Sequence, residues 1–124
     1  MALKKINPTK TTSWRALEKH FAEAKHFQLP KLFQTNKQRA KEFAVTFEEL
    51  HFDFSNNLIN EETLHLLVNF AEEVDVKDAI EKYFSGAPIN ETEGRSVLHT
   101  ALRSSSEEAV FVAGKDVKPK IKQP

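Results

Sequence analysis

Apolar residues recur every three to four positions in the first part of the chain, which is the spacing of a helix with one buried face. We expect this helix to be capped by Thr11, Thr12 or Ser13 and to stop before Leu29-Pro30. Its apolar face would consist of Trp14, Leu17, Phe21 and Ala24. Pro30 suits the first position of a short helix that continues through residues 31–34, and Asn36 can cap a third helix over residues 37–42.

The apolar period then changes to two, which is typical of strands. Residues 43–47 and 50–54 alternate apolar and polar positions around Glu48-Glu49 and predict a β-hairpin with one aromatic face. We expect the phenylalanines of this region and of the later helices to form the core. They are Phe43, Phe47, Phe52, Phe54, Phe70 and Phe84.

Two further helices and a strand are predicted after the hairpin. Asn60 can cap a helix running to about Val74, and Asp75 can cap the next one, which Gly86 and Pro88 would end. Residues 109–113 are a short apolar strand candidate. The predicted fold class is therefore α+β, a mainly helical segment with a β-hairpin and a short terminal strand. Since such a strand usually needs neighbours on both sides, we expect the chain to be truncated at its C-terminus.

The segment from residue 86 to residue 103 carries the most chemical information. Asn90 or Thr92 can cap a helix that begins near Glu93, and we attribute Gly94 in its first turn to a close backbone approach. On that helix Arg95, His99 and Arg103 would lie four residues apart and form a cationic ridge.

Such a ridge could bind the phosphate of a ligand or hold acidic side chains of a neighbouring element. Arg95, His99 and Arg103 are therefore the candidate substrate-binding residues, and we favour the structural role because acidic residues are abundant between Glu61 and Glu93. The sequence offers no catalytic residue and no metal site, since its histidines show no ligand spacing and it contains no cysteine.

The charges balance overall but are segregated along the chain. The chain contains eighteen Lys and Arg and eighteen Asp and Glu, and this balance argues against a nucleic-acid binder. Residues 1–42 hold ten basic against three acidic residues, whereas residues 43–113 hold four against fourteen. With no apolar run long enough to cross a bilayer and no apolar stretch after Lys4-Lys5, we expect no membrane association and a cytoplasmic location.

The run Ile89–Arg103 closely resembles the INxTEGRAVLHxALR segment of the glucose-6-phosphate isomerase family, with Ser96 where the family commonly has alanine. Residues 43–47, 53–58 and 114–117 are similar to the same family in the same order. The resemblance covers the chain from about Ser13 to Gly114.

This resemblance implies an enzyme of glycolysis and gluconeogenesis that interconverts glucose 6-phosphate and fructose 6-phosphate without a cofactor. It implies a two-domain α/β fold, a homodimer, and proton transfer by a Glu base through an enediol. In the family, the phosphate loop, the Glu base and the His and Lys of ring opening lie downstream of this segment, so we expect the chain alone to be inactive.

The expected organisation is a flexible basic arm over residues 1–12, followed by the N-terminal helical and hairpin segment of a larger isomerase over residues 13–124. The alternative is a stand-alone helical protein-interaction module that uses its basic face. The two differ in completeness, because an isolated segment should expose apolar surface that a self-sufficient module would bury.

Overall fold

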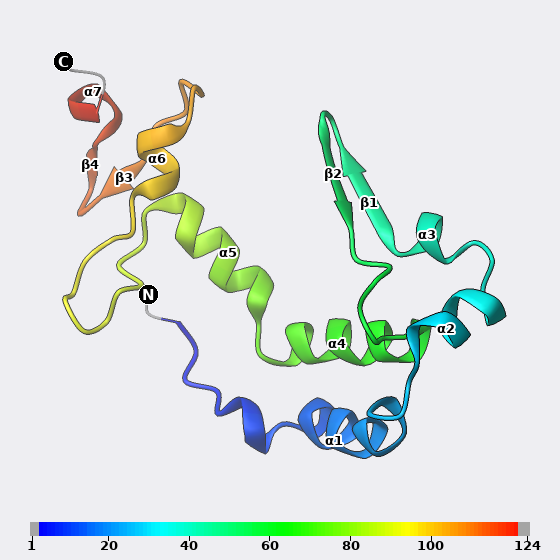
Figure 1. The fold of residues 1–124 in the computed structure, drawn as a ribbon. Helices are drawn as coiled ribbons and strands as arrows, with labels where there is room; N and C mark the ends of the chain where they lie inside the picture. Colours follow the sequence, from blue (N-terminus) through cyan, green and yellow to red (C-terminus); the bar gives the residue numbers. More distant parts are fainter. Residues whose placement is uncertain (1–2, 122–124) are drawn as a thin grey trace. The chain divides into compact units, whose positions relative to one another are not determined.

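The computed structural model describes residues 3–121 and divides them into two compact units. One unit comprises residues 8–70, and the other comprises residues 71–121 together with residues 3–7. The elements, in chain order, are η1 (Pro8–Lys10), α1 (Thr12–Ala24), α2 (Leu29–Thr35), α3 (Arg39–Glu42), β1 (Ala44–Phe47), β2 (Leu50–Asp53), α4 (Glu61–Glu73), α5 (Val76–Ser85), α6 (His99–Arg103), β3 (Phe111–Val112), β4 (Lys115–Asp116) and α7 (Lys118–Ile121) (Figure 1). The predicted α+β class is confirmed.

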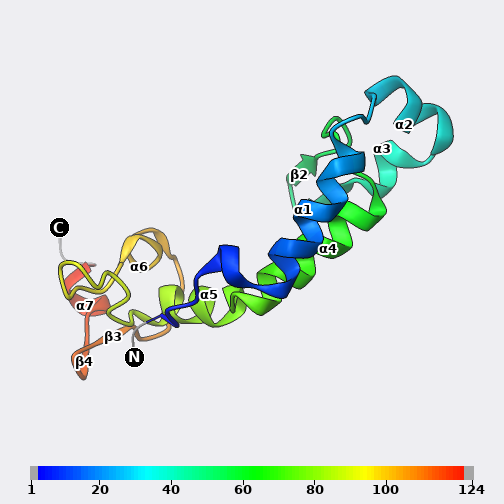
Figure 2. The same cartoon turned by 90° about the horizontal axis from the view of Figure 1, so that it is seen from below.

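Helices α1 and α4 lie side by side in the unit of residues 8–70 (Figures 1 and 2). The rings of Trp14 and Phe70 connect them, with centroids 5.8 Å apart. The predicted apolar face of α1 is only partly covered, because Phe21 remains 63% exposed while the polar His20 is buried. The packing between these helices is therefore mixed, with apolar rings at one point and a polar contact at another.

Local caps start both helices as the sequence predicts. The Asn60 side-chain oxygen accepts the Thr63 backbone N–H at 2.9 Å, and the Thr63 hydroxyl oxygen accepts the Asn60 N–H at 3.2 Å. At α1, Thr11 Oγ1 accepts the Trp14 N–H at 3.2 Å and donates to the Pro8 carbonyl at 2.6 Å. Each pair satisfies amide groups that the first turn of a helix leaves without partners.

Substituting Thr11→Ala is expected to lower the free energy of unfolding by about 1–2 kcal/mol, because a buried hydroxyl loses both roles at the start of α1. Thr35→Ala is the matched control, since that exposed hydroxyl only donates to carbonyls of its own helix. Urea unfolding followed by circular dichroism measures both. Equal losses in the two variants would contradict a capping role for Thr11.

The hairpin forms where the alternating pattern predicts it. Strands β1 and β2 pair antiparallel, with Val45 opposite Phe52 and Phe47 opposite Leu50. Asn36 does not cap α3, which starts at Arg39; its side-chain oxygen instead accepts the Gln38 N–H at 2.9 Å.

The aromatic core expected from the sequence is only partly present. Phe43 is 4% exposed and packs edge-on against Phe54, whereas Phe47, Phe52 and Phe84 are 60–68% exposed. The prediction was wrong for these three residues. One face of a two-stranded hairpin is buried only when a second layer of structure packs against it. Within residues 3–121, no such layer covers the aromatic face of this hairpin.

In the other unit, α5 begins directly after Asp75, but the predicted capping role of this residue was wrong, since its side chain makes no capping hydrogen bond. Its carboxylate pairs instead with the Lys4 ammonium, a contact that lowers the pKa of Asp75 and raises the pKa of Lys4. Gly86 ends α5 with a φ of +79°, as expected for a glycine after a helix. The flexibility of the arm over residues 1–12 stays a prediction, and residues 1–2 lie outside the described part.

The helix predicted from Glu93 is shorter than expected. Asn90 and Arg95 exchange two backbone hydrogen bonds, of 3.1 and 3.2 Å, which close a turn over residues 91–94. Gly94 adopts a φ of +62° in this turn, and a Cβ there would meet no atom within 4 Å. The glycine therefore serves the left-handed backbone of the turn, and the expected close backbone approach was wrong.

The caps proposed for this helix were also wrong. Helix α6 begins at His99 after Leu98, with no side-chain cap. The Thr92 hydroxyl donates to the Asn90 side-chain oxygen at 2.8 Å inside the turn. The two residues satisfy each other there, so neither of them starts α6.

The terminal strand is shorter than predicted and has a local partner. Residues 111 and 112 pair antiparallel with Asp116 and Lys115 across a turn at Ala113-Gly114. Both turn residues have positive φ values, of 49° and 75°, as a two-residue hairpin loop requires. Within residues 3–121, no helix combines the length and the apolar composition that crossing a bilayer requires.

Candidate functional site

The structure separates the three residues of the predicted cationic ridge. Arg95 closes the turn of residues 90–95 and is not helical, so the ridge prediction was wrong for this residue. Its side chain is 78% exposed and lies 3.9 Å from the Glu93 carboxylate. His99 and Arg103 do lie one helical turn apart, on α6.

His99 and Arg103 line a shallow cavity of about 320 Å³ between α5 and α6. The α5 residues Tyr83 and Phe84 form its aromatic side, with ring centroids 5.6 Å apart. Both cationic candidates are exposed, and within the described residues neither pairs with a carboxylate. The cavity thus combines a guanidinium and an imidazole with two aromatic rings.

Arg39 is a buried cation that no sequence pattern singled out. It is 1% exposed, and its Nε and Nη2 atoms donate to the backbone oxygens of Ser55 and Asn57 at 2.8 and 2.7 Å. The guanidinium also lies 4.3 Å from the ring centre of Phe43 and 5.6 Å from that of Phe33. Burial lowers the pKa of Arg39 below its ordinary value, yet a guanidinium stays charged throughout the physiological range.

This arrangement fixes the base of the hairpin. The two carbonyls belong to the segment that follows β2, and the Phe43 ring lies directly before β1. The single side chain of Arg39 therefore ties both ends of the hairpin to α3. Its role in the described structure is to position the hairpin, since Nε and Nη2 are both engaged with backbone carbonyls.

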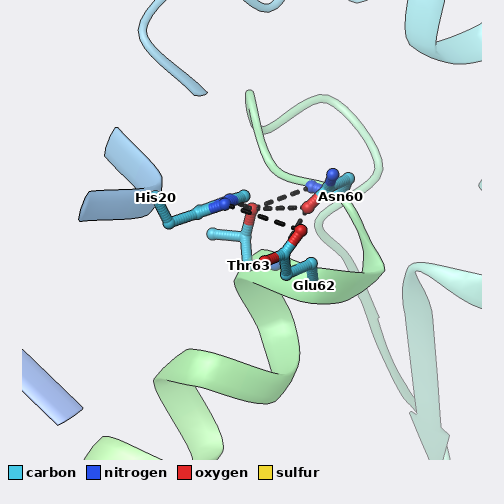
Figure 3. A network of polar contacts seen from close by, with 4 residues as sticks. All are labelled: His20, Asn60, Glu62 and Thr63. Carbon is cyan, nitrogen blue, oxygen red and sulfur yellow. Dashed lines mark hydrogen bonds and ion pairs between the residues drawn. The ribbon is translucent and has the colours of Figure 1, made fainter. Parts of the chain in front are cut away.

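A second buried polar group lies between α1 and α4 (Figure 3). His20 Nε2 is 2.7 Å from Thr63 Oγ1, and His20 Nδ1 is 3.8 Å from a Glu62 carboxylate oxygen. The His20 side chain is 5% exposed, whereas that of Glu62 is 65% exposed. The sequence does not reveal this partner of His20, because Thr63 is 43 residues away in the chain.

His20 also borders an apolar groove of about 870 Å³ along α1. Most of its lining is aromatic or aliphatic, from α1, α4 and the segment before α4. The lining side chains include Trp14, Leu17, Phe21, Leu58, Ile59 and Leu67. The groove leaves apolar side chains of α1 and α4 in contact with solvent.

Lys118 is another buried cation of the described structure. It is 5% exposed, and its ammonium donates to the carbonyls of Ser104 and Ser106 at 3.3 and 2.9 Å. It thus holds the segment after α6 against α7. No group of three or more His, Asp and Glu side chains suited to a metal ion occurs in the part of the chain that the structure describes.

Comparison with known proteins gives the context of these features. The family model described as phosphoglucose isomerase matches residues 53–124. A glucose-6-phosphate isomerase from Christiangramia forsetii (strain DSM 17595 / CGMCC 1.15422 / KT0803) is 41% identical over 121 residues, which is 98% of this chain. The chain spans 22% of the length of that relative.

Proposed function

The chain belongs to the phosphoglucose isomerase family, and from this membership we propose that it forms the N-terminal helical and hairpin segment of an enzyme interconverting glucose 6-phosphate and fructose 6-phosphate. The observation that carries the proposal is the 41% identity to a glucose-6-phosphate isomerase across 98% of the chain. A match of that extent covers both compact units, so it supports one role for the whole segment.

The proposed chemistry needs no cofactor. An acid and a base open the sugar ring, and a Glu base then moves a proton between adjacent carbons through an enediol. We propose that the groups performing these steps lie outside residues 1–124. The side chains described above support this division, because Arg39 and Lys118 are engaged with backbone carbonyls and His20 with Thr63.

We further propose that Arg95, His99 and Arg103 do not bind the sugar phosphate. The position of Arg95 in the turn of residues 90–95, outside the helix that carries His99 and Arg103, supports this view, since a phosphate site requires converging donors. The longer enzyme would act on the sugar phosphate as a cytoplasmic homodimer. The exposed apolar groove along α1 is consistent with a segment that packs against further protein.

The chain alone is expected to show no isomerase activity. A coupled assay that follows formation of glucose 6-phosphate from fructose 6-phosphate measures it, with the Christiangramia forsetii relative as the positive control. Turnover by the purified chain above the enzyme-free background would contradict the proposed absence of catalytic groups.

A chimera tests the family role separately. In it, this chain replaces the matching segment of the Christiangramia forsetii relative, and activity within about tenfold of that relative is expected because the catalytic groups are left in place. A chimera that is folded but inactive would count against the proposed scaffold role.

A further inference from the structure

The hydrogen bonds around Thr63 assign the proton on the His20 ring. The Thr63 backbone N–H donates to Asn60 Oδ1 at 2.9 Å, so that atom is an oxygen and an acceptor. Thr63 Oγ1 lies 2.8 Å from the same Oδ1, a distance at which one of the two oxygens must hold a hydrogen. Only the Thr63 hydroxyl has one, so it donates to Asn60.

With its hydrogen committed, the Thr63 oxygen can only accept from His20. The Nε2 atom of His20, 2.7 Å away, must therefore carry a hydrogen (Figure 3). A neutral imidazole has one N–H, so Nδ1 then presents a lone pair. That lone pair faces the Glu62 carboxylate at 3.8 Å.

This arrangement makes the contact between the helices sensitive to protonation. In the neutral ring, two acceptors face each other and no hydrogen lies between them. A second proton on Nδ1 converts the pair into an N–H donor facing a carboxylate, while the bond to Thr63 is kept. Since His20 belongs to α1 and Glu62 to α4, the gained attraction acts between the two helices.

We propose that His20 and Glu62 form a proton-dependent clamp that holds α1 more tightly to α4 when the imidazole is charged. The clamp is independent of the proposed function, because it rests on this unit alone. The Glu62 side chain is 65% exposed, whereas the His20 ring beside it is 5% exposed.

The other groups around the ring leave this pairing intact. The Phe27 ring lies edge-on at 6.1 Å between centroids. Glu18 and Lys25, which carry opposite charges, border the apolar groove along α1 next to His20. Among the described residues, the carboxylate found within 4 Å of the imidazole is that of Glu62. The remaining lining from α4 and the segment before it is uncharged.

Nitrogen NMR tests the proton assignment directly. In the chain labelled with ¹⁵N, long-range spectra at pH 8 are expected to show His20 Nε2 protonated and Nδ1 bare. The opposite tautomer would overturn the proposal, because Glu62 would then already accept a hydrogen bond from the neutral ring.

The pH dependence of stability tests the clamp. We compare pH 5.5 with pH 8, because the added attraction requires the second proton on Nδ1 and is therefore favoured at the lower pH and lost as the pH rises. The melting temperature of the native chain, relative to that of Glu62→Gln, is expected to fall by about 2–5 °C over this range.

Glu61→Gln is the matched control. Its carboxylate lies next in sequence and 4.0 Å from the exposed His65, and it does not face His20. Its pair with His65 is exposed on both sides, so its removal should change the pH dependence less than Glu62→Gln does. If Glu62→Gln behaves as Glu61→Gln does, the clamp does not exist. Both carboxylates are exposed, so neither variant disturbs the packed interior.

Discussion

Replacing Arg39 with alanine is expected to lower the free energy of unfolding by about 2–4 kcal/mol. The change removes two hydrogen bonds from a charged donor, each worth about 1.5–3 kcal/mol, and the cation–π contact with Phe43, worth about 1 kcal/mol. The carbonyls of Ser55 and Asn57 lose their donor as well. Part of this loss is offset, because the buried guanidinium no longer has to be dehydrated.

Urea unfolding of the chain measures this effect, and two variants calibrate it. Arg39→Lys keeps a charge but cannot reach both carbonyls from one planar group, so an intermediate loss is expected. Lys41→Ala changes an exposed cation of the same helix and should alter stability by no more than about 0.5 kcal/mol. If Arg39→Ala were as mild as Lys41→Ala, the guanidinium would not hold the hairpin.

The second large effect is expected at Gly86. A Cβ at this position would lie 3.0 Å from Val110 Cγ1 and 3.2 Å from the Phe111 carbonyl oxygen, while the backbone has a φ of +79°. Gly86→Ala therefore combines backbone strain with steric overlap against the segment entering β3, for an expected loss of about 2–3 kcal/mol.

Gly94→Ala separates the two contributions. This glycine also has a positive φ, of +62°, but a Cβ would meet nothing within 4 Å. Only the strain remains there, so a loss of about 1 kcal/mol is expected. Melting curves of the two variants measure the difference, and equal losses would show that the contacts with Val110 and Phe111 contribute nothing.

Features that depend on neighbouring residues could be predicted from the sequence. Thr11 and Asn60 cap α1 and α4 because a hydroxyl or amide side chain reaches the N–H three residues ahead of it. Gly86 ends α5 because it adopts a left-handed backbone at little cost. The period-two pattern set the register of β1 and β2 in the same local way. Family membership also followed from a local motif, the run Ile89–Arg103.

The turn of residues 90–95 shows how a local prediction fails. Asn90 and Thr92 are good capping residues, but two backbone bonds between Asn90 and Arg95 compete with the first turn of a helix. The turn prevailed because Gly94 takes a φ of +62° easily. As a result, Arg95 lies in the turn and not in a helix that would align it with His99 and Arg103.

By itself, the sequence determined most of the elements, the capping residues Thr11, Asn60 and Gly86, and the family, because these depend on residues within one turn or one motif. Tertiary structure decided which side chains are buried. The carbonyls bound by Arg39 lie 16 and 18 residues away in the chain, and Thr63 lies 43 residues from His20. A local sequence pattern could therefore not predict these contacts. Phe47 and Phe52 stayed exposed for the converse reason, because an apolar face is buried only when another layer covers it.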